Sequence, residues 1–247
     1  MRYLFLLLAM LCSCGQHSPK SEWQEGEQAV VSRVMDGDTF ALNTGQVVRL
    51  VGIEAPSFAY RDRAEMPYAE KAKRELENLV LGETVQLYYP GLTRDRYDRA
   101  LAQAYVLPKT GKPIWVNEAL VQRGAAWVRL YPDTSKGSDQ LWQAEDQARD
   151  LKRGMWGLGE APTLKLNAKS LPDRVFIIIE GEPASSTKED GICQTTIPHT
   201  AGNIIIQHEL LDQNSACLAP ATRTLEVRGW IREGTIRDNG LNIRQFD

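Results

Sequence analysis

The sequence has no surplus of positive charge, no zinc-type cysteine pairs and no apolar run long enough to cross a membrane. Lys and Arg total 29 against 32 Asp and Glu, which argues against a protein that coats nucleic acid through charge. Four cysteines and three histidines, without a C-x-x-C pair, do not match the zinc patterns. With 43% apolar and 25% charged residues in 247, disordered, collagen and multi-pass membrane classes are excluded.

The N-terminus has the features of an export signal. Arg2 precedes the apolar run 3–11, which is too short for a transmembrane anchor. Leu11-Cys12-Ser13-Cys14 is similar to a bacterial lipobox, so residues 1–13 are predicted to be a signal peptide and Cys14 to carry lipid. Cys12 is unusual in that motif, so plain secretion stays open, as does a buried helix. We expect a protein of the cell envelope or periplasm, held by a lipid anchor only and without a transmembrane helix, or else a secreted one.

If the protein is exported, its remaining cysteines lie in an oxidising compartment, where disulfides form. Cys193 and Cys217 are the only cysteines beyond the lipobox-like sequence 11–14, and a single pair in one segment predicts a disulfide.

Composition divides the rest of the chain into four segments. We expect a polar tether over 14–28, a dense globular domain over 29–159, a linker over 160–172 that contains Pro162 and Pro172, and an accessory β-rich domain over 173–247. The globular segment holds 18 Lys and Arg and 17 Asp and Glu. Strong binding to long nucleic acid is therefore not expected, and short or single-stranded substrates are favoured.

Residue periodicity predicts a mainly β fold with helices for the globular segment. Helical spacing of apolar residues appears in three places, at 69–80, 116–124 and 138–154. Five β-prone runs lie at 30–34, 39–42, 47–53, 84–89 and 101–107, which suggests a small five-stranded barrel of the OB-fold kind. The C-terminal segment has strong strand patterns at 175–179 and 225–231 and weaker ones at 203–207 and 242–246; it too could form a small OB-like barrel.

Three polar clusters could carry chemistry. The first is Asp36-Gly37-Asp38-Thr39, which is also a common hairpin turn. The second is the segment 49–56, RLVGIEAP, where Gly52 permits a bulge that turns Arg49 and Glu54 to one side. The third is the mixed-charge loop 94–99, which alone is more typical of a solvated hairpin loop.

In order and spacing, these clusters resemble the motifs of the staphylococcal nuclease (thermonuclease) family. The resemblance continues through VNEALVQRG at 116–124 and KRGMWG at 152–157. It implies a five-stranded OB barrel with three helices, and a Ca²⁺-dependent phosphodiesterase that hydrolyses DNA and RNA. By the same resemblance Asp38 and Glu54 are the metal carboxylates, Ala55 offers a main-chain carbonyl, and Arg49 and Arg99 bind the scissile phosphate. Hard oxygen ligands suit Ca²⁺, and guanidinium groups suit phosphate.

Three positions depart from the family pattern. Ser57 stands where the family has the general-base Glu, Glu54 replaces an Asp, and Asp98 stands where a Gly precedes the second arginine. A serine hydroxyl cannot accept the proton of the attacking water at neutral pH without a base of its own. Asp62 or Glu65 could replace the missing base, or a metal could acidify the water. Two alternatives stay open: a catalytically silent OB module that binds nucleic acid or another envelope ligand, and a structural envelope lipoprotein.

Overall fold

The computed structural model describes residues 19–61, 63–209, 217 and 224–246. The predicted signal peptide, the lipidation site Cys14 and Asp62 lie outside the described residues. Within these residues, no helix is both long enough and apolar enough to span a bilayer.

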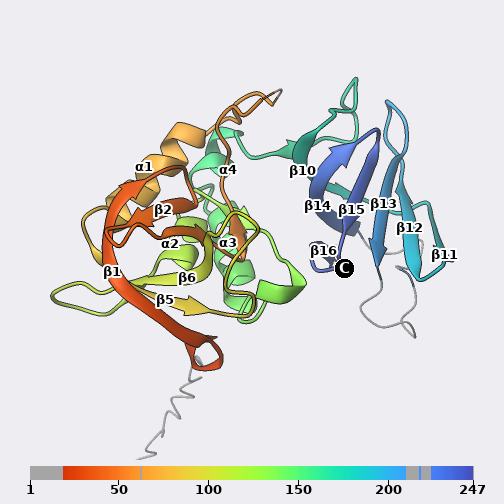
Figure 1. Ribbon diagram of the computed structural model, residues 1–247. Helices are drawn as coiled ribbons and strands as arrows, with labels where there is room; N and C mark the ends of the chain where they lie inside the picture. The colour runs from red at the N-terminus through yellow and green to blue at the C-terminus, as the bar shows by residue number, and fades with distance from the viewer. Residues whose placement is uncertain (1–18, 62, 210–216, 218–223, 247) are drawn as a thin grey trace, which may run out of the picture.

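Five strands form a closed barrel, which confirms the predicted OB fold (Figure 1). Its strands are β1 (Gln24–Val34), β2 (Thr39–Leu42), β3 (Val47–Leu50), β5 (Thr84–Tyr89) and β6 (Ala100–Val106). Neighbours in the order β3-β2-β1-β5-β6 are antiparallel, and a parallel pairing of β3 with β6 closes the barrel. Three helices accompany the barrel as predicted: α1 (Ala69–Val80), α2 (Val116–Gln122) and α3 (Asp139–Asp150).

Several short elements complete this part of the chain. They are η1 (Pro19–Glu22), β4 (Ile53–Glu54), β7 (Ile114–Trp115), β8 (Trp127–Val128), η2 (Pro132–Thr134) and α4 (Met155–Leu158). The pairing of β4 with β8 fixes Glu54 opposite Trp127.

Strand β1 begins earlier than the sequence indicated. Residues 24–28, which we expected in the polar tether, pair with the end of β5 from Gln24↔Tyr89 onward. Backbone pairing does not depend on apolar side chains, so the polar composition hid this stretch. The preceding Trp23 is buried, and its ring centroid lies 5.5 Å from that of Trp115.

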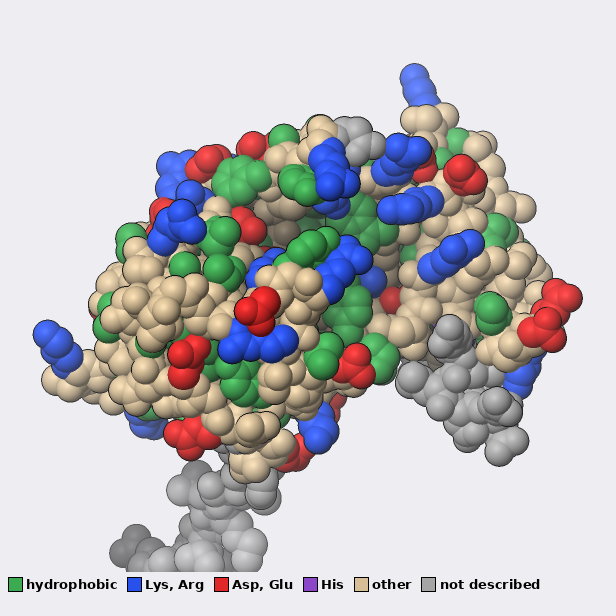
Figure 2. Space-filling model, viewed as in Figure 1, with side chains coloured by type: hydrophobic (Ala, Val, Ile, Leu, Met, Phe, Trp, Pro, Cys, Tyr) green, Lys and Arg blue, Asp and Glu red, His purple; other side chains and the backbone are tan. Residues whose placement is uncertain are grey.

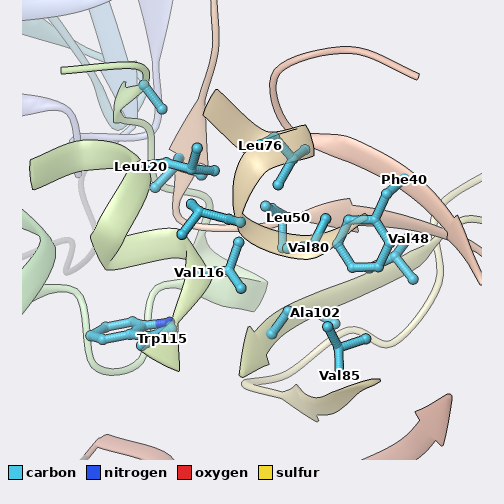
Figure 3. Packing of buried hydrophobic residues seen from close by; sticks show 14 of the residues in the cluster. Phe40, Val48, Leu50, Leu76, Val80, Val85, Ala102, Trp115, Val116 and Leu120 are labelled. Carbon is cyan, nitrogen blue, oxygen red and sulfur yellow. The ribbon is translucent and has the colours of Figure 1, made fainter. Parts of the chain in front are cut away.

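The core lies between the barrel strands and the helices α1 and α2 (Figure 3). Phe40, Val48 and Leu50 come from the strands, while Leu76 and Leu120 come from the helices. On α1 the buried positions recur at the helical spacing seen in the sequence, so one face of the helix covers the barrel.

Two glycines explain why the motifs at 116–124 and 152–157 meet. Met155 N–H donates to Gly124 O at 3.0 Å. A Cβ on Gly154 would lie 2.4 Å from that same oxygen, so only glycine allows this close approach.

The remaining strands form a second, eight-stranded sheet (Figure 1). They are β9 (Thr163–Leu164), β10 (Val175–Gly181), β11 (Ser185–Glu189), β12 (Ile192–Ile197), β13 (Ile204–Glu209), β14 (Thr224–Arg232), β15 (Thr235–Asp238) and β16 (Ile243–Phe246). All four predicted C-terminal strand patterns correspond to strands of this sheet. β9 lies in the segment expected to be a linker and pairs with β10.

Buried ion pairs join the second sheet to α3. The fully buried Arg228 on β14 donates to both carboxylate oxygens of Glu145, at 2.7 and 2.6 Å, and to Glu226 at 2.8 Å. Arg149 lies 2.7 Å from Glu145 and also contacts Glu226. Burial alone would raise the pKa of Glu145, but the charge and hydrogen bonds of Arg228 outweigh it and lower that pKa.

Apolar and polar contacts extend the same interface. The ring centroids of Trp127 and Phe176 are 5.1 Å apart. Asn242 Oδ1 accepts from Leu130 N at 2.7 Å, and its amide nitrogen donates to Leu130 O at 3.0 Å. Because these hydrogen bonds satisfy buried backbone and side-chain groups across the interface, they fix the second sheet against the barrel.

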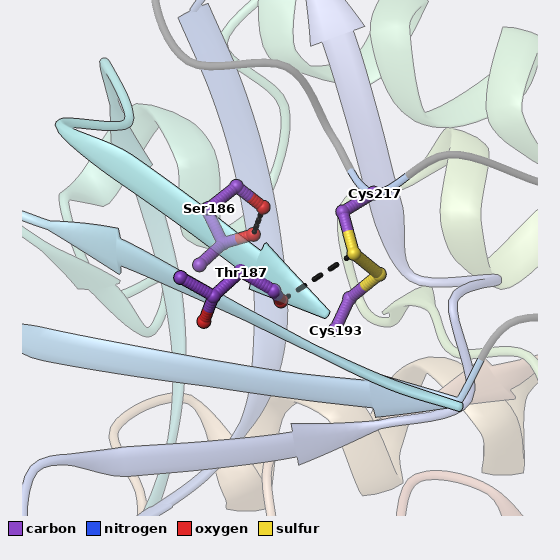
Figure 4. The surroundings of a disulfide bond; sticks show 5 residues. Ser186, Thr187, Cys193 and Cys217 are labelled. Atoms are coloured by element: carbon purple, nitrogen blue, oxygen red, sulfur yellow. Dashed lines mark hydrogen bonds between the residues drawn. A yellow bond between two sulfur atoms is a disulfide. The ribbon is translucent and has the colours of Figure 1, made fainter. Parts of the chain in front are cut away.

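Cys193 on β12 forms a disulfide with Cys217 (Figure 4). The bond closes a loop between residues 24 apart in sequence. It therefore restricts the unfolded chain within the segment that supplies the second sheet.

Replacing both cysteines by alanine should destabilise the second sheet by about 2–4 kcal/mol, because the unfolded chain regains the entropy of that loop. Chemical denaturation followed by tryptophan fluorescence measures the change, and the reduced wild type serves as the matched control. Equal unfolding midpoints for the oxidised wild type and the double variant would contradict this expectation.

Candidate active site

Asp38 is a buried carboxylate at the start of β2. Its Oδ2 accepts a hydrogen bond from Ala55 N at 2.8 Å and lies 2.9 Å from Arg49 Nη1. Its Oδ1 accepts from Thr39 Oγ1 at 3.1 Å. Burial raises the pKa of Asp38 to about 7, with Arg49 opposing and Asp36 adding to the rise. The carboxylate is thus held in place but is costly to keep charged.

The turn before Asp38 needs its glycine. A Cβ on Gly37 would lie 2.6 Å from Cβ of Ala55 and 2.8 Å from Cβ of Ala72 on α1. The glycine lets the turn pack against both segments, which brings Asp38 within hydrogen-bond distance of Ala55.

Arg49 and Glu54 line one cavity although their spacing along a regular strand would place them on opposite faces. Gly52 lies between β3 and β4 with φ of +78°, and this break reorients the chain. Arg49 Nη1 donates to Leu50 O at 2.7 Å, so its guanidinium is fixed. Burial raises the pKa of Glu54 even though Arg49 and Arg129 oppose the shift.

Arg99 reaches the same cavity from the loop before β6. Asp95 orients it: Arg99 Nε donates to Asp95 Oδ2 at 2.8 Å, and Nη2 lies 2.7 Å from that oxygen. The backbone N–H groups of Tyr97 and Arg99 also donate to Asp95. Burial would raise the pKa of Asp95, but these hydrogen bonds and Arg99 lower it.

Asp98, which stands where the family has a Gly, makes no ion pair with Arg99 within the described residues. Its side chain is 90% exposed, and its carboxylate lies 3.9 Å from Arg94. Asp98 has φ of 60°, a left-handed conformation that favours glycine and that Asp tolerates better than most residues. The turn geometry directs this side chain outward, and Asp95 takes the orienting role instead.

The cavity has a volume of about 540 Å³. Besides Arg49, Glu54 and Arg99 it is lined by Tyr97, Arg129 and Tyr131. Asp38 does not line the cavity itself, but its carboxylate contacts Arg49, which does.

Arg129 was not singled out in the sequence. It lies in the cavity wall, its Nη1 donates to Arg228 O at 3.0 Å, and it lies 3.3 Å from the buried carboxylate of Asp238. One buried arginine therefore connects the cavity to the second sheet. The sequence around Arg129 did not indicate this role, because the residues that its side chain contacts are 99 or more positions away.

Ser57 lies apart from the arginine cavity. It lines a neighbouring pocket together with the exposed Glu65, Met66 and Trp230. Among the described residues, no three His, Cys, Asp or Glu side chains are grouped closely enough to hold a metal ion. Of the two carboxylates that the resemblance assigns to the metal, Asp38 contacts Arg49 and Glu54 lines the cavity.

Comparison with known proteins assigns the chain to a family. Residues 47–157 match the staphylococcal nuclease homologue family. A thermonuclease of Staphylococcus hyicus is 30% identical over 129 residues, which are 51% of this chain and 73% of that protein. The chain belongs to the staphylococcal nuclease family.

Further relatives of this nuclease family agree. A thermonuclease of Staphylococcus intermedius is 28% identical over 134 residues, covering 53% of this chain and 77% of that protein. The SPbeta prophage-derived endonuclease YokF of Bacillus subtilis is 33% identical over 131 residues, 51% of this chain and 43% of that protein. The family match includes Arg49, Glu54 and Arg99, and it ends before the second sheet begins.

Proposed function

We propose that this protein is a nuclease that hydrolyses phosphodiester bonds of DNA or RNA in the Arg49–Arg99 cavity. The observation that carries the proposal is the convergence of two oriented guanidinium groups on one cavity, beside the buried Asp38 and the half-buried Glu54. The thermonuclease and endonuclease names of its relatives support the same activity.

In this mechanism Arg49 and Arg99 bind the oxygens of the scissile phosphate. Asp38 and Leu50 O fix Arg49, while Asp95 fixes Arg99, so both cations are oriented before substrate arrives. Prearranged cations stabilise the charge that develops on the phosphoryl oxygens without reorganising during the reaction. Because both side chains stay protonated at neutral pH, we assign them electrostatic roles.

Asp38 and Glu54 fit Ca²⁺ as hard oxygen ligands, with the carbonyl of Ala55 as a further donor. Burial raises the pKa of both carboxyls, and Asp36 adds to the rise at Asp38, so a nearby divalent cation would relieve an unfavourable negative charge. When bound, Ca²⁺ supplies further stabilisation of charge on the phosphoryl oxygens.

Chelation should lower hydrolysis of single-stranded DNA by at least about 10²-fold, because metal stabilisation of the transition state is worth several kcal/mol. Asp38→Asn should weaken Ca²⁺ binding in titration calorimetry and lower the rate similarly, while Asp139→Asn, which makes the same change at an exposed position on α3 outside the cavity, serves as the control. Full activity in the chelator would exclude the proposed metal role.

Ser57 favours a second candidate function, a catalytically silent nucleic-acid binder. The serine lies in a different pocket from the two arginines, and a binder needs no general base. Binding of oligonucleotides without any hydrolysis, in Ca²⁺ and at low salt, would favour this candidate over the nuclease.

We also propose that the protein is exported and is held at the envelope by lipid on Cys14, or is secreted if Cys14 is not modified. The lipobox-like sequence 11–14 supports the anchor. The mass of the mature N-terminal peptide distinguishes these two forms.

A further inference from the structure

A second groove lies between the barrel and the second sheet. Its volume is about 800 Å³, and it is lined from the barrel side by Tyr60, Arg61, Arg63 and the loop 96–99. The other side is lined by residues 173–174, just before β10, and by Trp230, Arg232 and Glu233 at the end of β14. In Figure 2, Lys and Arg side chains gather on both sides of the hollow between the two parts. The groove exists only because the second sheet packs against the barrel.

The groove is strongly cationic. Two acidic residues, Asp173 and Glu233, line it against six arginines: Arg61, Arg63, Arg96, Arg99, Arg174 and Arg232. Within the described part of the chain, no carboxylate lies within 4.0 Å of Arg61, Arg63, Arg96 or Arg232. Arginines gathered this closely repel one another unless an anion lies between them, so the groove suits a ligand with several negative charges.

Aromatic rings alternate with these arginines. The Arg61 and Arg63 guanidinium groups lie 5.2 and 5.7 Å from the ring centroid of Tyr60. Arg96 lies 4.8 Å from that of Tyr97. Tyr60 is 56% exposed and Tyr97 is 66% exposed, so both rings are accessible from solvent. Arginines next to exposed aromatic rings suit a single strand rather than a duplex. The arginines can bind its phosphates, and its unpaired bases can stack on the rings.

The groove is continuous with the candidate active site. Arg96, Tyr97 and Arg99 line both cavities. A strand whose phosphate lies between Arg49 and Arg99 therefore has a direct path along the 96–99 loop into the groove.

We propose that this interface groove binds the single strand on one side of the scissile phosphate, so that the second sheet supplies a substrate subsite. The inference rests on the proposed nuclease function and adds a binding site, formed jointly by the barrel and the second sheet, for several nucleotides of a single strand beyond the scissile phosphate. The buried contacts of Arg228 and Arg129 fix the position of the second sheet relative to the barrel, and so fix the two sides of the groove.

The test compares Arg61→Ala/Arg232→Ala, one change on each wall, with Arg33→Ala/Arg74→Ala. The control pair removes the same charge at exposed positions on β1 and α1, outside both cavities. Fluorescence anisotropy in chelator measures binding of a 12-nucleotide single strand, its duplex and anionic phospholipid vesicles. Hydrolysis of a dinucleotide in Ca²⁺ reports on the catalytic cavity alone.

The groove variant should bind the single strand about tenfold more weakly at 50 mM salt, and its salt slope should fall by about 1.4, since two phosphate contacts are lost. Its kcat/KM for the dinucleotide should stay within about twofold of wild type. Tyr60→Ala should weaken single-strand binding by at least about fivefold without changing the salt slope, because it removes a stacking face.

Single-strand affinity equal to wild type in the groove variant, with the dinucleotide still cleaved, would overturn the groove and leave the nuclease proposal standing. Loss of vesicle binding alone would overturn it in favour of a membrane contact. If wild type in Ca²⁺ cleaves neither the dinucleotide nor the 12-nucleotide single strand, the proposed nuclease function is removed, and with it the scissile phosphate on which the subsite depends.

Discussion

Replacing Arg49 by alanine should lower the rate of single-stranded DNA hydrolysis by at least about 10²- to 10³-fold, the usual effect of losing one prearranged donor to a developing negative charge. Arg49 is fixed by Asp38 and Leu50 O and faces the cavity. Its loss removes the cation that offsets the buried Asp38 charge and, with it, the proposed phosphate contact. Steady-state kinetics with and without Ca²⁺ measure the effect.

Two variants separate this role from general destabilisation. Arg49→Lys keeps the charge but loses the planar fork, so it should recover little activity. Arg33→Ala removes an exposed arginine from β1 and should leave the rate unchanged. Hydrolysis that persists in Arg49→Ala at the wild-type rate would show that the activity arises elsewhere.

Replacing Arg228 by methionine should destabilise the protein by about 3–5 kcal/mol, because it leaves two buried carboxylates without their main cation. Arg228, Glu145 and Glu226 have fully buried side chains, and Arg228 bonds to both acids. Urea denaturation at pH 7 measures the loss. Arg244→Met is the matched control, since the Arg244–Asp146 pair is partly exposed and should contribute no more than about 1 kcal/mol.

The loss of stability in Arg228→Met should become smaller as the pH falls. Arg228 lowers the pKa of Glu145 below the ordinary 4.5, so the ion pair stabilises the fold above that pH and less as pH falls. In Arg228→Met, burial raises the pKa of the same carboxyl instead, so acid neutralises an unpaired buried charge. The stability difference between wild type and variant should therefore narrow below about pH 4.5, and a gap that widens in acid would contradict the assignment.

Much of the barrel was predictable because its signals are local. The helical spacing on α1, the turn at 36–38 and the break at Gly52 each act over a few residues, and together they place Asp38, Arg49 and Glu54 around one site. Polar strands were missed. The start of β1 and the strands β11, β12 and β15 pair through their backbones, and they show weaker hydrophobic patterns than the strands recognised in the sequence.

The orienting contacts of the site were less predictable. Asp95, rather than the adjacent Asp98, holds Arg99, because the left-handed turn at Asp98 directs its side chain outward. Arg129 joins the cavity to the second sheet through partners about a hundred residues away. Sequence spacing carries little information about such contacts, since they depend on how two separately patterned segments pack.

Local motifs in the sequence by themselves indicated the family and the barrel, and they proposed the site residues, of which Arg49, Glu54 and Arg99 line one cavity. The composition gives a near-neutral barrel segment and a chain with a net charge of −3. Only the tertiary structure decided where that charge lies. It gathers six arginines from four separate segments into one groove beside the active-site cavity. A net charge is a sum without positions, whereas the potential that a phosphate meets depends on distances between charges, and folding sets those distances.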